Sequence, residues 1–438
     1  MQHLDTVEVG TATYLLAAQF GTEGISSYRM DNATGALTHV DDIGAAQGLG
    51  INAPTDFETV TAFGKTWVIM GSAGTSMLNV LELEADGTLT AADQIMDTRE
   101  TRFGGVQSVT ATEVDGHVFV VAGGADDGLS LFTLMPDGRL IHLETIEHTP
   151  GAGLMNVGEI ETSVVGGDLQ IYVSSATDAG LTRFRVDLGD LGDVHRGDGD
   201  GAGTRSGGAG DDLMIAGQSD YLRGGDGDDI LVGAQDARLS GGRGADRFVM
   251  SETGGSSRIL DFTAGEDILD LSSYVMLRSA AQVEVNSNAS GARVSVRDTV
   301  IDIRSSNGMS LDRDDLFADE FQWPDRIPML DRDPTQVFVP EIQPLPVPAT
   351  TQRPMANTNA AEAVLPEIET SSPGAPTPSP VATPTPAPVP MPAAPSLQHP
   401  LCVTAVARQR PLRAERQATG LTAVAGTTGS SDATGRTN

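Results

Sequence analysis

The feature that most constrains this chain is a nine-residue motif, rich in glycine and aspartate, that occurs three times between residues 207 and 249. The copies begin at Gly207, Gly224 and Gly241, so successive copies start 17 residues apart. Each copy fits G-G-x-G-x-D-x-U-x, in which U is a large apolar residue. A short motif at a fixed period predicts the stacked, equivalent coils of a parallel β-roll. A flexible linker, the alternative for such a composition, has no need of an apolar residue at the same place in every copy.

The first part of each copy predicts a turn, and the last part predicts a short strand. Glycine tolerates positive φ and has no Cβ, so the glycines permit a tight turn. One apolar residue of each copy is expected to point into the coil, and so is one leucine of each eight-residue segment between copies. These inward residues are Met214, Leu231 and Phe248 from the copies and Leu222 and Leu239 from the segments between them.

The aspartate at the sixth position of each copy predicts a cation site. Stacking puts Asp212, Asp229 and Asp246 in a column on one edge of the roll. Calcium takes six to eight oxygen ligands, often carboxylates mixed with backbone carbonyls. The three coils leave two gaps, so we expect two calcium ions. The carbonyls are expected from the glycine turns, namely Gly208, Gly210, Gly225, Gly227, Gly242 and Gly244.

Other acidic residues near the copies are less regular. Asp211 and Asp228 come one place before the column and either face solvent or reach an ion. The opposite edge offers Asp220 and Asp236, which are out of register and lack the double glycine, so we expect weak or no ion binding there. Upstream, residues 197–203 have the composition of a copy without its register and suggest a frayed first coil.

These copies resemble the repeats of the RTX family, also called hemolysin-type calcium-binding repeat proteins. Residues 258–271 resemble the segment that caps an RTX roll, and residues 299–303 and 311–317 resemble the closing hairpin and short helix of that cap. The resemblance covers residues 197–321. It implies export by a type I secretion apparatus, a secreted, extracellular location, and a roll that folds on meeting external calcium. A column of carboxylates repels itself until a cation neutralises it, so metal binding and folding are expected to be coupled.

A second, longer repeat occupies the N-terminal half of the chain. The tripeptide G-x-L follows a polar turn at Gly35, Gly87, Gly138 and Gly189, at spacings of 52, 51 and 51 residues. Alternating and apolar segments around these turns predict four strands per repeat. Such repeats indicate β-propeller blades, and they resemble lactonase-type propellers in pattern. A β-sandwich or stacked sheets are the alternative, and four blades could form either a closed ring or an open set.

The expected fold is therefore all-β. A β-propeller-like domain of four four-stranded units is expected over residues 1–195, a calcium-binding roll over 196–250 and its β-rich cap over 251–322. All but three of the 24 prolines lie beyond residue 323. Such a segment favours extended polyproline conformations and cannot bury a core. Residues 323–438 are therefore expected to form a Pro-rich disordered tail.

Composition disfavours several kinds of partner. The chain has 60 acidic and 27 basic residues, a net charge of −33, which disfavours nucleic acid and anionic membranes. No apolar run is long enough to span a bilayer. The one cysteine, Cys402, allows no intrachain disulfide. No N-terminal signal peptide pattern is present, which agrees with the RTX resemblance, because type I export reads an uncleaved C-terminal signal.

The sequence contains no recognisable catalytic motif, so the first hypothesis is a binding protein whose propeller-like domain recognises an unknown protein or carbohydrate. His39, His117, His142 and His148 are read as surface residues, because H-E-x-x-H is absent. The alternative is a lactonase-like hydrolase with structural calcium, in which turn acids hold a metal. Those acids are Asp126, Asp127 and Asp178. A cytolytic toxin is disfavoured, because toxins of this family carry long apolar segments that insert into membranes and this sequence contains none.

Overall fold

The computed structural model describes residues 2–19, 23–150, 152–178, 180–197, 201–252, 254–317, 321, 323–329 and 403–407. Within these ranges the regular structure is β-strand, except for α1 (Arg313–Phe317) and two 3-10 helices, η1 (Ala45–Gln47) and η2 (Ala280–Gln282). The all-β prediction is confirmed. Most of the expected Pro-rich tail, residues 330–402 and 408–438, lies outside the described residues. No helix of the described part is long and apolar enough to cross a membrane.

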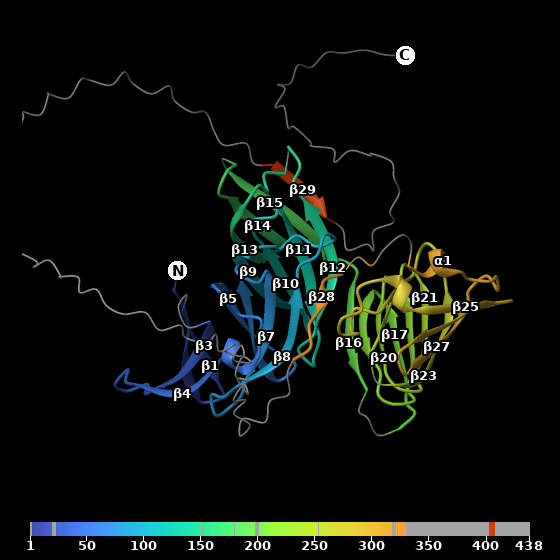
Figure 1. Cartoon of the computed structure of the whole chain (residues 1–438), viewed down its shortest axis with the longest axis horizontal. Helices are drawn as coiled ribbons and strands as arrows, with labels where there is room; N and C mark the ends of the chain where they lie inside the picture. Colours follow the sequence, from blue (N-terminus) through green and yellow to red (C-terminus); the bar gives the residue numbers. More distant parts are fainter. Residues whose placement is uncertain are drawn as a thin grey trace, which may run out of the picture. The chain divides into compact units, whose positions relative to one another are not determined.

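The N-terminal half folds into four sheets, one for each repeat of the sequence (Figure 1). Their strands are β1 (Gln2–Val9), β2 (Ala12–Gln19), β3 (Gly24–Met30) and β4 (Leu37–Gly44); β5 (Pro54–Ala62), β6 (Lys65–Ser72), β7 (Met77–Leu83) and β8 (Leu89–Met96); β9 (Ser108–Val114), β10 (His117–Gly123), β11 (Gly128–Leu134) and β12 (Leu140–Glu147); and β13 (Val157–Val165), β14 (Asp168–Ser175) and β15 (Leu181–Asp187). The turns at Gly35, Gly87 and Gly138 each connect a third strand to a fourth, as expected.

The first strands of successive sheets, β1, β5, β9 and β13, pack against one another. The Thr59 hydroxyl on β5 donates to Asp5 on β1 (3.0 Å), and the Val109 N–H on β9 donates to Asp56 on β5 (2.9 Å). Apolar cores fill the spaces between successive sheets, as in a propeller. Within the described strands, no extensive contact links β13–β15 back to β1–β4.

The middle sheets are buried on both faces because each has a neighbouring sheet on either side. Every residue of β10 and β11 is buried. Trp67 on β6 packs with Phe103 and Phe132 in the core between the second and third sheets. Burial on both faces explains why residues 66–71 read as a continuous apolar run instead of an alternating one.

The fourth sheet differs from the sequence interpretation. The G-x-L at Gly189 leads into β16 (Leu191–Arg196), which pairs in parallel with β18 (Asp211–Ile215) of the roll and not with β15. The place beside β15 is taken by β29 (Val403–Ala407), in parallel. The first strand of the roll therefore begins before the boundary expected at residue 195. The side chain of Val194 on β16 packs with Leu213 of β18, and this apolar contact favours pairing of β16 with the roll.

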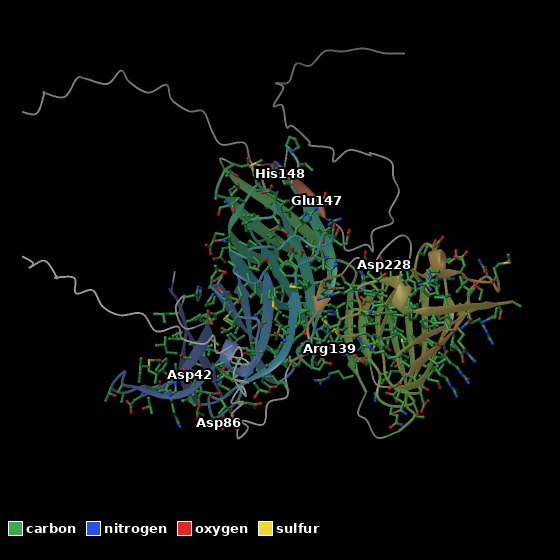
Figure 2. The ribbon with its side chains drawn as sticks, viewed as in Figure 1. Asp42, Asp86, Arg139, Glu147, His148 and Asp228 are labelled. Atoms are coloured by element: carbon green, nitrogen blue, oxygen red, sulfur yellow. The ribbon has the colours of Figure 1, made fainter. Side chains whose placement is uncertain are left out.

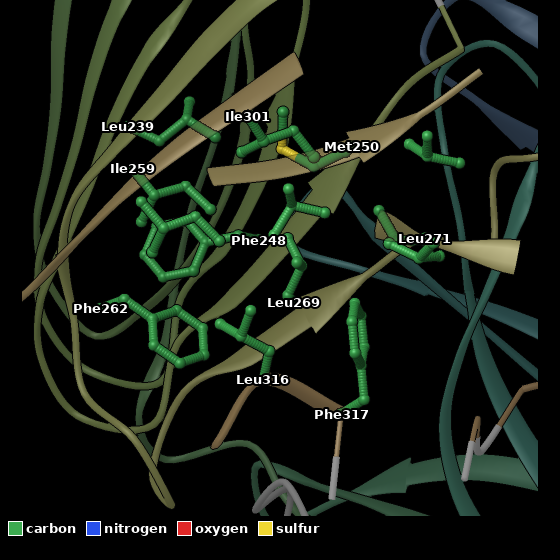
Figure 3. Close-up of a cluster of buried hydrophobic side chains, with 14 of the residues drawn as sticks. Leu239, Phe248, Met250, Ile259, Phe262, Leu269, Leu271, Ile301, Leu316 and Phe317 are labelled. Atoms are coloured by element: carbon green, nitrogen blue, oxygen red, sulfur yellow. The ribbon is translucent and has the colours of Figure 1, made fainter. Parts of the chain in front are cut away.

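The roll consists of two parallel sheets, one on each side of the coils (Figure 1). One sheet contains β16, β18, β20 (Ile230–Gly233), β22 (Arg247–Met250) and β24 (Ile268–Asp270); the other begins with β17 (Thr204–Ala209), β19 (Tyr221–Asp226), β21 (Arg238–Arg243) and β23 (Gly255–Phe262). Strands of adjacent copies pair one motif period apart, as Leu231 pairs with Phe248. All five expected inward residues are fully buried in one core, part of which Figure 3 shows.

A hairpin and the short helix close the roll. The second sheet continues with β27 (Thr299–Ser305), β26 (Gly291–Val296) and β25 (Glu284–Asn288), and β27 pairs in parallel with β23. Leu316 and Phe317 of α1 belong to the same core as Phe248 (Figure 3). The hairpin and helix expected over 299–303 and 311–317 are thus present.

Residues 323–329 were expected in the tail, but they pack on the folded chain. Within them, β28 (Asp325–Arg326) pairs antiparallel with β8, and Trp323 joins the core of the roll. Proline content misled the prediction here, because Pro324 and Pro328 flank a strand of only two residues and do not interrupt its pairing.

Candidate metal centre

The three aspartates of the copies stand in a column within the roll. The Asp212 N–H donates to Oδ1 of Asp229 (2.9 Å), and the Asp229 N–H donates to Oδ1 of Asp246 (3.1 Å). These residues are 2%, 1% and 1% exposed, respectively. Each coil therefore uses one carboxylate oxygen to bind the backbone of the coil before it.

The column is longer than the sequence indicated. The Asp246 N–H donates to Oδ1 of Asp267 (3.1 Å), and the Asp193 N–H donates to Oδ1 of Asp212 (2.7 Å). Asp267 ends the column, because its N–H donates to the Thr263 carbonyl oxygen (2.9 Å) and not to a further carboxylate, while its Oδ2 accepts the Thr263 N–H (2.7 Å). Its turn lacks the double glycine and lies 21 residues after the previous one. The signal that could have found it is Gly265-Glu-Asp267, which repeats the spacing of Gly244-Ala-Asp246.

The second oxygens of the column are the chemically informative atoms. Oδ2 of Asp212 and Oδ2 of Asp229 are buried and have no hydrogen-bond partner within the described part of the chain. Each lies against the first glycine of its own copy, so a Cβ on Gly207 or Gly224 would overlap it. The sequence interpretation did not single out these first glycines as site residues, although they make the room that the carboxylates occupy.

The second and third glycines of each copy bring backbone carbonyls to the same edge. All six have φ between 101° and 139°, a region that favours glycine. A Cβ on Gly225 would overlap the carbonyl oxygen of Gly208, and one on Gly227 would overlap that of Gly210. The same contacts recur one coil later, where Gly242 and Gly244 stack on Gly225 and Gly227. Carbonyl oxygens therefore lie between successive turns.

Asp211 and Asp228 form a second, shorter ladder (Asp228 is labelled in Figure 2). The Asp228 N–H donates to Oδ1 of Asp211 (2.8 Å), and the Ala245 N–H donates to Oδ1 of Asp228 (2.8 Å). Both carboxylates thus bind the backbone of the next coil. The ladder stops at Ala245, which has no carboxylate.

Burial makes the column difficult to ionise without a counter-charge. Desolvation, with neighbouring aspartates adding to it, raises the pKa of Asp229 to about 7 and that of Asp246 to about 8. Desolvation also raises the pKa of Asp267 to about 7 and that of Asp211 to about 6, and it raises the pKa of Asp212. A cation that supplies positive charge between the coils would remove this penalty.

The donor set fits a hard cation. It contains only carboxylate and carbonyl oxygens, which suit calcium, and no sulfur or imidazole. Nowhere in the described ranges do three or more His, Cys, Asp or Glu side chains converge as a metal-binding group. An ion at the column would be held by two aspartates and backbone carbonyl oxygens.

The described residues of the opposite edge offer no comparable site. Asp220 is fully buried, and its two oxygens accept the N–H groups of Gly203 (2.7 Å) and Gly217 (2.8 Å). Asp236 is exposed, and its Oδ1 accepts the Ser256 hydroxyl (3.3 Å). Both oxygens of Asp220 and one oxygen of Asp236 thus have protein partners.

The histidines of the propeller-like sheets have separate partners (His148 is labelled in Figure 2). His39 pairs with Asp42 (2.9 Å), and Nδ1 of His148 accepts the Leu154 N–H (3.1 Å) and lies 3.7 Å from Oδ2 of Asp178. His117, expected on the surface, is buried, and its Nε2 lies 3.1 Å from the Gly192 carbonyl oxygen. His142 is likewise buried, and its Nε2 lies 2.8 Å from the Thr145 hydroxyl. They form no common site.

The sequence indicated only one member of a half-buried acidic pair, Asp97 and Asp126. Asp126 lies beside Asp97, which the sequence did not single out, and a Cβ on Gly104 would stand 2.9 Å from Oδ2 of Asp97 and 3.1 Å from Oδ2 of Asp126. Desolvation raises the pKa of Asp97 to about 7 and also raises that of Asp126. Two half-buried carboxyl groups that face the same glycine resist ionising together. Asp127 instead accepts the Asn156 N–H (2.8 Å).

No family model and no curated protein matches the chain. Similar solved structures include a protein from Lactobacillus plantarum, with 16% identity over 43% of this chain and 52% of that chain and a TM-score of 0.33. A protein assigned as a 6-phosphogluconolactonase from Bacteroides uniformis shares 14% identity over 42% and 53%, with a TM-score of 0.30. SapL1 lectin, solved with α-methyl fucoside, shares 12% identity over 42% and 60%, with a TM-score of 0.30. The chain spans about half the length of the first two proteins, and similarities this low support no conclusion about activity or ligand.

Proposed function

We propose that this chain is a secreted calcium-binding protein of the RTX type, whose roll folds on extracellular calcium and whose propeller-like sheets are a binding platform. The observation that carries the proposal is the pair of buried, unpartnered Oδ2 atoms of Asp212 and Asp229 on adjacent coils. A buried carboxylate oxygen without a partner is costly, and a shared divalent cation offsets that cost. Asp229 would serve both gaps of the column, and Asp246 would complete the second.

Export by a type I secretion apparatus and an extracellular location extend this proposal. They are supported by the RTX resemblance of residues 197–321. They are also supported by the chemistry of the column, because a roll that needs calcium to neutralise its aspartates stays unfolded where calcium is scarce. A chain in that state is suited to passage through a secretion channel before it folds.

The propeller-like sheets are the proposed platform for a protein or carbohydrate ligand. The net charge of −33 argues against nucleic acid as that ligand. A lactonase-like hydrolase is the second candidate, and the Asp97–Asp126 pair favours it, because a carboxyl group with a pKa near neutrality can act as a general acid or base. Hydrolysis of a lactone panel by the full chain, abolished by Asp126→Asn and kept by Asp127→Asn, would support the enzyme.

Calcium titration of the full chain tests the main proposal. Calorimetry should detect two ions, and circular dichroism should show a gain of β signal on binding. Asp229→Asn should abolish both responses, because it removes a ligand from each gap. Asp236→Asn is the matched control on the exposed opposite edge and should bind like the parent protein. Absence of calcium binding, or binding unaffected by Asp229→Asn, would contradict the proposal.

A further inference from the structure

Residues 323–329, here called the strap, connect the roll to the second blade. The Ile327 N–H donates to the Gln94 carbonyl oxygen on β8 (3.0 Å), and the Gln94 side chain donates to the Pro328 carbonyl oxygen (2.9 Å). On its other side, the strap accepts the Met276 N–H of the cap at the Arg326 carbonyl oxygen (2.9 Å). The strap therefore makes backbone hydrogen bonds to both regions.

Arg326 is the centre of the strap. Its guanidinium forms an ion pair with Asp93 of β8, and these residues are 6% and 3% exposed. The same guanidinium donates to the carbonyl oxygens of Ser272 in the cap (2.9 Å) and Leu140 on β12 (2.8 Å). One buried side chain thus joins the second blade, the third blade and the cap.

The cap end of this link is connected to the aspartate column. Asp267, the last member of the column, directly precedes β24. At the end of β24, Oδ1 of Asp270 accepts the Ser272 N–H (2.7 Å), which orients the segment whose carbonyl Arg326 binds. Asp270 is also held by Arg247 (2.9 Å), the residue after Asp246. Few residues separate the column from Arg326.

Two further contacts join the third blade to the roll. Met135 and Ile141 share an apolar cluster with Leu213, Val232 and Val249 of the roll. Arg139, labelled in Figure 2, lies between them in sequence and donates to the Ser273 hydroxyl of the cap (2.7 Å). The second and third blades therefore lose partners if the roll is unfolded.

We infer that the strap makes the stability of the propeller-like sheets depend on cation binding in the roll. The inference rests on the proposed function, since it requires that calcium folds the roll. Without the folded roll, Asp93 would lose the buried partner that neutralises it, and Arg326 would lose the Ser272 carbonyl. Calcium would thus act on the binding platform at a distance from its own site.

The two tryptophans of the chain allow a direct test. Trp67 is buried between the second and third sheets, and Trp323 lies in the strap. In a Trp323→Phe background, urea unfolding followed by Trp67 fluorescence reports on the sheets alone. At free calcium one hundred times its Kd, full coupling raises the folded-to-unfolded ratio reported by Trp67 about one hundredfold for each ion bound.

Removal of the Asp93–Arg326 ion pair should abolish most of the calcium-dependent rise in the folded-to-unfolded ratio. The double variant Asp93→Leu/Arg326→Met removes both charges and leaves no lone buried ion, so calorimetry should still detect calcium binding. In this variant, calcium should raise the folded-to-unfolded ratio reported by Trp67 less than tenfold. Arg326→Lys, which keeps a charge beside Asp93 but loses the planar fork that reaches both carbonyls, should show an intermediate gain even if the double variant fails to fold. Arg293→Lys, the same change in an exposed cap ion pair with Asp302, should behave like the parent.

The outcomes separate the two proposals. If calorimetry detects calcium but Trp67 unfolding does not respond to it, the coupling is wrong and the proposed function stands. If the gain is unchanged in both the double variant and Arg326→Lys, the strap is not the link and the inference is overturned. If calorimetry detects no calcium binding, both proposals fail.

Discussion

The propeller-like sheets and the roll are both built from repeats, but different interactions hold them together. Between the sheets, apolar side chains such as Trp67 and Phe132 pack from both sides. Inside the roll, the apolar core around Phe248 shares each coil with a buried carboxylate. The coil is short, so each turn stacks directly on the next, and a polar residue at the turn is buried in every repeat. The short period of the roll therefore buries a polar group in every repeat, at the turn where successive coils stack.

The largest effect is expected from removing one aromatic ring from each core. Phe248→Ala and Phe132→Ala should each cost about 3–5 kcal/mol of unfolding free energy, because each ring is fully buried. Phe248→Ala should also lower the apparent calcium affinity more than Phe132→Ala, because it disrupts the coils that hold the ion directly, whereas Phe132→Ala acts on them only through the strap. Urea unfolding and calorimetry measure the two effects. Equal losses of calcium affinity would mean that the two regions do not differ as described.

The next effect comes from the space beside the column. Gly224→Ala puts a Cβ onto Oδ2 of Asp229, so it should weaken calcium binding at least tenfold, or about 1.4 kcal/mol. Gly10→Ala in the first sheet is the control, because Gly10 has φ +63° and nothing within 4 Å of an added Cβ. It should cost about 1–2 kcal/mol of stability from backbone strain alone and leave calcium affinity unchanged. Unchanged calcium affinity in Gly224→Ala would show that the carboxylate does not need this position.

The pH dependence of stability can distinguish the roll from the propeller-like sheets without any mutation. The pKa of Asp229 is raised to about 7 and that of Asp246 to about 8, so the folded, calcium-free roll binds more protons than the unfolded chain above about pH 4. Its stability should therefore fall as pH rises from about 4 to about 8. Glu144 in the sheets, with a pKa raised to about 7 by burial, contributes with the same sign.

Calcium distinguishes these two contributions. Because the ion favours ionised aspartates, saturating calcium should cancel the fall contributed by the roll and leave the share of the sheets. Thermal unfolding at pH 5 and pH 8, with and without calcium, measures the difference. An identical pH dependence in both conditions would argue against an ion at the column.

The smallest effect is expected at the variable position of the motif. Arg243 has a highly exposed side chain and lies 3.5 Å from the exposed Asp226. Arg243→Ala should change stability by less than about 0.5 kcal/mol, and calcium affinity should stay the same. A clear loss of affinity in calorimetry would mean that this exposed ion pair helps to shape the turn.

The sequence by itself determined the features that depend on local period. The 17-residue spacing predicted the coils, their five inward residues and the column of Asp212, Asp229 and Asp246, because equivalent residues in stacked coils must lie above one another. The longer repeat predicted four blades, because hairpin turns and alternating strands are encoded within a few neighbouring residues.

Tertiary structure alone decided the features that join distant segments. β16 pairs with the roll and not with the fourth blade, and Asp97 lies beside Asp126. Arg326 forms an ion pair with Asp93, although more than two hundred residues of chain separate them. None of these has a periodic signal, because each depends on which unsatisfied hydrogen-bonding or charged group is nearby after the repeats have packed. Asp267 stands between the two cases: its turn keeps the glycine and aspartate spacing, but only stacking on Asp246 shows that it extends the column.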